Sequence, residues 1–294
     1  MRRIGLLLVG LTLLPPIVRG DEKAARVPDN YEVQRDIFYL PKEESSADEY
    51  QRQMCRLDVY YPKDQPGFAT MVWIHGGGLY GGARKLAGPM KTCPGRLLEQ
   101  GVAIVSVDYR LHPKVTCPVY VQDAAAGVAW ALRNIQRYGG NPRQVFLGGG
   151  SAGAYLAALI GLHKRWLNEW GSEADQIAGI VPVSGHMVTH FTIRKERGIP
   201  QHQIVVDEFA PLRHVRADAP PILLMTGDRD LELLGRYEEN AYFLRMLKVA
   251  GHKNVTLLEF KGCNHTTCNE PADGPMWEWM QKIIHPDAAT KDSP

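Results

Sequence analysis

The sequence predicts an α/β fold with a mostly parallel central sheet and helices on both faces. Short apolar runs rich in β-branched residues recur along the 294-residue chain, and segments of helical length separate them. Most runs are continuous rather than alternating, which is typical of strands buried on both faces of a parallel sheet. No shift in composition divides the chain, so we expect a single domain.

The individual elements follow from this pattern. The expected strands, in chain order, are residues 57–61, 70–74, 103–108, 145–147, 177–183, 222–226 and 255–260. Residues 121–138 are rich in Ala and end at two glycines, which predicts a helix, and apolar residues at helical spacing across 234–247 predict another. Residues 186–214 show no clear period. We expect them to form an insertion on the upper rim, which either borders an active site or is a solvated loop.

The two ends of the chain differ from the folded part. Residues 1–20 have the pattern of a secretory signal: two arginines, an apolar stretch over 4–14, and a helix-breaking exit. The stretch is shorter than the roughly 20 apolar residues of a spanning helix, and an uncleaved anchor is the alternative. Residues 21–30 form a polar leader, 31–285 the folded domain and 286–294 a polar tail. We therefore expect an exported protein, periplasmic or secreted, that is not membrane-bound after cleavage.

The charge of the chain excludes one class of partner. There are 34 basic and 32 acidic residues, a formal charge of +2. Removing residues 1–20 deletes three arginines and no acid, which leaves 31 basic against 32 acidic residues and a charge of −1. A nucleic-acid surface needs clustered Lys and Arg, and no long basic run is present, so we expect no nucleic-acid partner.

The five cysteines allow two interpretations. In an exported chain some can pair. Spacing makes Cys263 with Cys268, and Cys93 with Cys117, the plausible bridges, although it does not fix the connectivity. The first bridge would restrict the loop between its two cysteines. The rival interpretation is a metal site at 263–268, but structural zinc usually takes four ligands from two CxxC-like pairs, and we expect no metal.

Residues 149–153, with the sequence GGSAG, carry the strongest functional signal. They lie directly after the expected strand 145–147 and before a helical run at 154–162. A tight strand-to-helix turn with small residues beside a serine is the pattern of a nucleophile elbow, which here would expose the hydroxyl of Ser151. The backbone N–H of Ala152 and the positive end of the helix could then stabilise an oxyanion.

Residues 75–78, with the sequence HGGG, give the second signal at the end of the strand 70–74. Consecutive glycines let backbone N–H groups approach a substrate, so Gly77 and Gly78 are candidate oxyanion donors. The alternative for the motif alone is a glycine turn between two elements. We expect His75 to support its own loop rather than to act as a base.

With these two motifs the chain resembles the α/β-hydrolase family, and more narrowly its esterase branch with an HGGG motif. The resemblance covers roughly residues 57–284 and includes the segment DYRL at 108–111. The segments look like bacterial exported carboxylesterases related to feruloyl and acetyl-xylan esterases, and the arylformamidase branch is similar. Relatives often carry His or Asp where this chain has Gly150, and glycine where its histidine loop has threonines and Cys268.

The resemblance implies a triad in the chain order serine, acid, histidine. The strand 222–226 runs into two carboxylates. The family acid commonly stands three residues after the glycine that ends this strand, which favours Asp230, with Asp228 as the alternative and the other as a turn residue. Of ten histidines, only His265 lies in a loop directly after the last expected strand, so it is the expected base.

The function expected from this set is serine-hydrolase cleavage of carboxylic esters through an acyl-enzyme. The substrate would be a small soluble ester or one attached to a polysaccharide. Arylformamidase-type amide hydrolysis is the alternative activity, and a non-catalytic hydrolase-fold binding protein is the alternative class. Because side chains and water suffice for the chemistry, we expect no cofactor.

Overall fold

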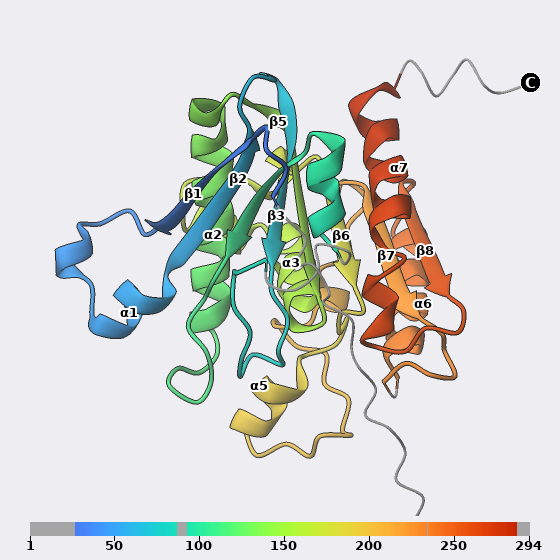
Figure 1. Cartoon of the computed structure of the whole chain (residues 1–294). Helices are drawn as coiled ribbons and strands as arrows, with labels where there is room; N and C mark the ends of the chain where they lie inside the picture. The colour runs from blue at the N-terminus through green and yellow to red at the C-terminus, as the bar shows by residue number, and fades with distance from the viewer. Residues whose placement is uncertain (1–26, 87–92, 234, 287–294) are drawn as a thin grey trace, which may run out of the picture.

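The computed structural model of the chain describes residues 27–86, 93–233 and 235–286 (Figure 1). The expected signal at 1–20, most of the leader at 21–30 and all but one residue of the tail at 286–294 lie outside the described residues. Within the described part of the chain, no helix combines the length and the apolar character that a membrane span requires.

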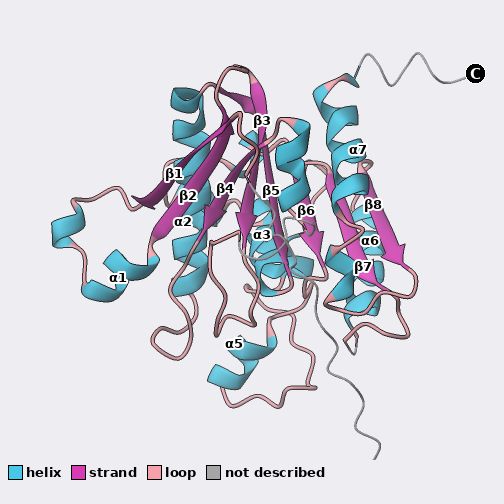
Figure 2. Cartoon of the chain, viewed as in Figure 1, coloured by secondary structure: helices cyan, strands magenta, loops and turns pink. Residues whose placement is uncertain are grey.

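Eight strands form one sheet in the order β1-β2-β4-β3-β5-β6-β7-β8 (Figure 2). β1 pairs with β2, and β2 with β4, in antiparallel register, whereas every later pairing is parallel. The expected, mostly parallel sheet is confirmed. The strands are β1 Tyr31–Phe38, β2 Arg56–Pro62, β3 Phe68–Ile74, β4 Ala103–Val107, β5 Gly140–Gly150, β6 Gly179–Val183, β7 Ile222–Gly227 and β8 Val255–Phe260.

Helices cover both faces of the sheet, as expected (Figure 2). Side chains that alternate along a strand point to opposite faces, so Val72 and Ile74 of β3 join one core and Met71 and Trp73 join the other. The first core packs against α2, α3 and α6, and the second against α7 and the short helix Gly95–Gln100. The helices are α1 Glu49–Met54, α2 Val119–Asn134, α3 Ala152–Leu162, α4 Arg165–Asn168, α5 Phe191–Glu196, α6 Arg236–Val249 and α7 Asp273–Ile284.

The clearest differences from the sequence expectation are at β1 and at the end of α2. The strand β1 was not expected, because YEVQRDIF carries polar residues along a sheet edge and its burial pattern is mixed. The helix expected at 121–138 ends as α2 at Asn134 and continues as the 3-10 turn Ile135–Tyr138, which Gly139 stops in the left-handed conformation. Neither difference changes the order of the sheet.

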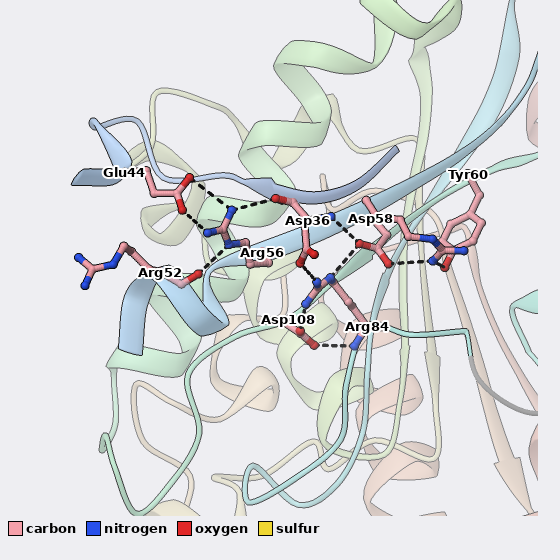
Figure 3. A network of polar contacts seen from close by, with 9 residues as sticks. Asp36, Glu44, Arg52, Arg56, Asp58, Tyr60, Arg84 and Asp108 are labelled. Carbon is pink, nitrogen blue, oxygen red and sulfur yellow. Dashed lines mark hydrogen bonds and ion pairs between the residues drawn. The ribbon is translucent and has the colours of Figure 1, made fainter. Parts of the chain in front are cut away.

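A charged network ties the loop that follows β3 to its neighbours in the sheet (Figure 3). Arg84, which is nearly buried, forms ion pairs with Asp36, with Asp58 on β2 and with Asp108 at the end of β4. Asp108 opens the DYRL segment noted in the sequence, and Arg110 of that segment pairs with Asp123 on α2 at 2.7 Å. These contacts hold the glycine loop at 75–82 from its carboxyl-terminal side.

Candidate active site

Ser151 lies in the turn between β5 and α3, at the carboxyl end of the central strand. Its φ of 53° and ψ of −114° are rare for a residue with a side chain. The N–H of Ser151 donates to the carbonyl oxygen of Val183 on β6 at 2.8 Å. A Cβ on Gly153 would lie 2.0 Å from the carbonyl oxygen of Ile74, so only glycine fits there. The structure therefore has the geometry of a nucleophile elbow.

His265 connects this serine to a carboxylate. Its Nε2 lies 2.9 Å from Ser151 Oγ, and its Nδ1 lies 2.6 Å from Glu232 Oε1. The ring stands in the loop after β8, where the side chain of Asn264 accepts from the N–H groups of Thr266 and Thr267. The expected pairing of Ser151 with His265 is thus present in the structure.

The expected acid is corrected: Glu232, rather than Asp230 or Asp228, contacts His265. Asp230 is exposed, and the spacing rule that favoured it places it outside the site. Asp228 accepts from the N–H groups of Asp230 and Gly262, at 3.1 and 2.9 Å, and begins a turn. The chain makes a further turn before the carboxylate, because the N–H of Glu232 donates to the carbonyl oxygen of Asp228.

Glu232 is surrounded by hydrogen-bond donors. Besides His265, its carboxylate accepts from Ser184 Oγ at 2.6 Å, from the N–H of Leu233 at 2.8 Å and from the N–H of Gly227 at 3.2 Å. Burial raises the pKa of this carboxyl, but the bonds from His265, Ser184 and Leu233 outweigh burial and lower its pKa to about 2. Glu232 is therefore an ionised, buried carboxylate at neutral pH.

One feature of the sequence marks Glu232 in retrospect. It is the only charged residue in the run LELL at 231–234, and a carboxylate in an apolar run is buried only when it has partners. A triad acid can be Asp or Glu. Ser184 gave no comparable signal; it follows β6 with a φ of 53°, and Ser151 has the same φ.

The glycine loop packs directly on the elbow. A Cβ on Gly76 would lie 3.3 Å from the Cβ of Ser151. Gly77 has a φ of 106°, and a Cβ there would lie 2.2 Å from the carbonyl oxygen of Gly81, so the turn requires glycine. Gly77 and Gly78 directly follow Gly76 in the chain, and Ala152, the residue after Ser151, begins α3. The loop and the helix start are therefore arranged around the serine.

His75 supports this loop and is not part of the hydrogen-bonded chain. Its ring stacks on Tyr109 with centroids 4.4 Å apart, and its Nδ1 lies 2.8 Å from the carbonyl oxygen of Gly76. Burial lowers the pKa of His75, which keeps the ring neutral at pH 7. Tyr109 donates its hydroxyl to the carbonyl oxygen of His75. The DYRL segment thus buttresses the HGGG segment.

The segment at 186–214 stands beyond the carboxyl ends of the parallel strands, where Figure 1 shows α5. It reaches the glycine loop, because Thr192 Oγ1 donates to the carbonyl oxygen of Gly78 at 2.6 Å. Phe191 lies beside the same glycine: a Cβ on Gly78 would lie 3.3 Å from its ring. Of the two alternatives left open by the sequence, the segment borders the site.

The two expected disulfides are absent, since all five cysteines are free in the structure. Cys268 is buried and points toward other partners: its Sγ lies 3.2 Å from Ser184 Oγ and 3.3 Å from the carbonyl oxygen of His265. Cys117 lies beside α5 instead, where its backbone N–H donates to Glu196. The residues that the structure describes hold no group of three His, Cys, Asp or Glu side chains fit to bind a metal.

Comparison with known proteins also identifies esterases. A family model, BD-FAE, matches residues 57–234. Esterase LipC of Mycobacterium tuberculosis is 29% identical over 71% of this chain and 56% of its own length. A probable isoprenylcysteine alpha-carbonyl methylesterase of Oryza sativa subsp. japonica is 29% identical over 78% of this chain and 59% of its own. The chain thus spans less than two thirds of either relative.

Solved structures agree in fold. A truncated carbohydrate esterase from gut microbiota has a TM-score of 0.71 at 19% identity, covering 89% of this chain and 99% of that one. Esterase B from Lactobacillus rhamnosis has a TM-score of 0.69 at 22% identity, covering 92% and 91%. At these identities the likeness shows the α/β-hydrolase fold.

Proposed function

Because the chain belongs to the BD-FAE family, an α/β-hydrolase esterase family, we propose that it hydrolyses carboxylic esters through an acyl-enzyme on Ser151. The observation that carries the proposal is the continuous chain Ser151 Oγ, His265, Glu232, with distances of 2.9 and 2.6 Å. A hydroxyl, an imidazole and a buried carboxylate in this order form an activated nucleophile.

In the first half-reaction Ser151 Oγ attacks the ester carbonyl carbon and gives its proton to His265 Nε2. The carbonyl oxygen becomes an oxyanion, which accepts from the N–H groups of Gly77, Gly78 and Ala152. When it collapses, the bond to the alcohol breaks and the alcohol oxygen takes the proton from Nε2. Each oxyanion donor of this kind contributes about 3 kcal/mol to transition-state stabilisation.

In the second half-reaction water replaces the alcohol. Nε2 of His265 accepts a proton from the water, whose oxygen attacks the acyl carbon, and the proton then returns to Ser151 Oγ as the acid leaves. Glu232 acts throughout by holding the hydrogen on Nδ1, so that Nε2 is the free base, and by stabilising the imidazolium. An ionised Glu232 is suited to this role.

The substrate that we propose is a small soluble ester or an ester group attached to a polysaccharide. Two likenesses support this: esterases are among the relatives, and one structure similar in fold is a carbohydrate esterase. We also propose export, with residues 1–20 as the signal. Secretion in the native host followed by intact-mass measurement tests it, since a mature chain that begins at Asp21 is expected and a retained residue 1 would refute it.

Hydrolysis of p-nitrophenyl acetate by the wild type and by Ser151→Ala tests the proposed activity. We expect turnover by the wild type and none above background by the variant, because no other hydroxyl is hydrogen-bonded to His265 among the described residues. A wild type without turnover would favour a binding protein. N-formylkynurenine as a parallel substrate separates ester from formamide hydrolysis, since preferential cleavage of it would replace the ester proposal.

A further inference from the structure

A cavity of about 780 Å³ lies between the segment 186–214 and the start of α6. Its wall is mainly apolar and includes Phe191, Ile204, Leu233 and Tyr242. The last three are more than half exposed, at 60, 51 and 57%. Apolar side chains around a concave space of this size are typical of a site that encloses a small molecule.

The cavity adjoins the candidate active site through two residues of its wall. Leu233 donates its backbone N–H to the carboxylate of Glu232. Phe191 lies against Gly78, as described above, and also lines the cavity. The glycine loop and Glu232 thus both lie against the wall of the cavity.

Two buried arginines, Arg194 of α5 and Arg236 of α6, line the same cavity and differ in their partners. Arg236 donates to the carbonyl oxygen of Ser184, its Nε has no partner, and the charges of Glu239 and Glu232 both act on it. Glu239 is held in place, since its carboxylate lies 3.0 Å from His186 Nδ1 and accepts from the N–H of Met187. Two carboxylates thus offset part of the effect that burial has on the charge of Arg236.

Arg194 has one such carboxylate, Glu239, rather than two. It is only 3% exposed, and its one hydrogen bond among the described residues joins Nη1 to the carbonyl oxygen of Gln203. Its Nε has no partner, and no carboxylate of the described chain pairs with it. Burial lowers the pKa of this guanidinium, and the charge of Glu239 offsets the effect only in part.

The other titratable groups on the wall do not supply the missing anion. Glu238 is exposed, and His202, on the segment 186–214, is an imidazole and carries no negative charge. A buried guanidinium with free donors is costly unless an acceptor satisfies it, and its fork of N–H groups matches a carboxylate in two parallel bonds. An apolar wall with a buried guanidinium that lacks partners fits a ligand that has an apolar body and a carboxylate.

We propose that this cavity binds the part of the ester substrate that carries a carboxylate, and that Arg194 determines specificity for it. The proposal rests on the esterase function proposed above and narrows its substrates to esters with an anionic group on the acyl or the alcohol side. Arg194 is a binding residue in this account. It does not contact the reacting carbonyl.

Two pairs of substrates test the proposal. On the acyl side, p-nitrophenyl hydrogen glutarate is compared with p-nitrophenyl valerate; on the alcohol side, 4-carboxyphenyl butyrate is compared with 4-carbamoylphenyl butyrate. The variants are Arg194→Met, Arg194→Lys and the control Lys195→Met. The control removes the same charge from the next position of α5, where the side chain is exposed. Binding of glutarate and 4-hydroxybenzoate to each protein is measured by calorimetry.

The wild type should prefer the anionic member of at least one pair by about 10- to 100-fold in kcat/KM, the range expected for a hydrogen bond to a charged group. Arg194→Met should lose this preference and the binding of the matching acid while keeping turnover of the neutral esters, which shows that it folds. Arg194→Lys should keep part of the preference, and Lys195→Met all of it.

Equal turnover of both members of both pairs by the wild type would overturn the proposal, as would a preference that survives in Arg194→Met. A different result distinguishes failure of the proposed esterase function from failure of the proposed anion site. If the wild type hydrolyses none of the four esters but binds glutarate or 4-hydroxybenzoate in an Arg194-dependent way, the anion site stands and the esterase activity fails.

Discussion

Replacing Glu232 by Gln is the sharpest perturbation of the site, because it keeps the shape of the side chain, removes the charge and turns one acceptor oxygen into a donor. All four groups around the carboxylate are donors: His265 and the N–H of Leu233 at one oxygen, Ser184 and the N–H of Gly227 at the other. The amide nitrogen of Gln must face one of these two pairs of donors. Either His265 turns to the wrong tautomer or Ser184 loses its acceptor.

The magnitude follows from the pKa of Glu232, which falls from an ordinary 4.5 to about 2. The surroundings therefore favour the ionised carboxylate by about 3 kcal/mol, and the partner that gains most when it becomes cationic is His265. Loss of about 3 kcal/mol from the transition state lowers kcat/KM about 10²-fold.

The assay is p-nitrophenyl acetate hydrolysis at pH 7.5 by the wild type, Glu232→Gln and Asp230→Asn. Asp230 is the matched control, a carboxylate two residues away that is exposed and does not contact His265. We expect the control to keep wild-type activity within about threefold, because exposed charges contribute little. A Glu232→Gln variant with wild-type kcat/KM, or an Asp230→Asn variant whose kcat/KM falls 10²-fold, would contradict the role of Glu232.

Three further outcomes are expected. Burial raises the pKa of Asp273 from 3.8 to about 6, so its ionisation destabilises the fold as pH rises. Asp273→Asn should therefore add about 3 kcal/mol to the free energy of unfolding at pH 8 and almost nothing at pH 4, as measured by urea denaturation. An equal gain at both pH values would count against this. Gly153→Ala should lose about 3 kcal/mol of stability, because its Cβ would lie 2.0 Å from the carbonyl oxygen of Ile74. Gly150→Ala should unfold like the wild type, because its Cβ would have no atom nearer than 3.5 Å. Equal denaturation midpoints for the two variants would contradict this steric difference. Ser184→Ala should lower kcat/KM about tenfold without loss of folding, because it removes one donor from Glu232; unchanged kinetics would show that this donor does not matter.

The sheet could be predicted from the sequence because its central strands are continuous apolar runs. β8 has the expected bounds of 255–260, and β7 extends the expected 222–226 by one residue. The edge strand β1 could not be predicted, because a strand exposed on one side carries polar residues. Its pairing with β2 also depends on contacts distant in sequence.

The elbow and the position of His265 could be predicted because each is fixed by a neighbouring strand. The acid could not, because the loop after β7 folds through a turn stabilised by Asp228, and spacing alone does not show that this turn brings residue 232 rather than 230 to the imidazole. Cysteine pairing failed for a similar reason: proximity in sequence does not decide where Cys268 points, and the structure directs it to Ser184.

Ser151 is proposed above as the nucleophile of an ester hydrolase. The most direct measurement is labelling of the wild type and Ser151→Ala with a fluorophosphonate probe, followed by peptide mass spectrometry to locate the adduct. We expect one adduct on the wild type, on Ser151, with labelling much slower in His265→Ala and absent in Ser151→Ala. A wild type that stays unlabelled, or an adduct on any other residue, would contradict it.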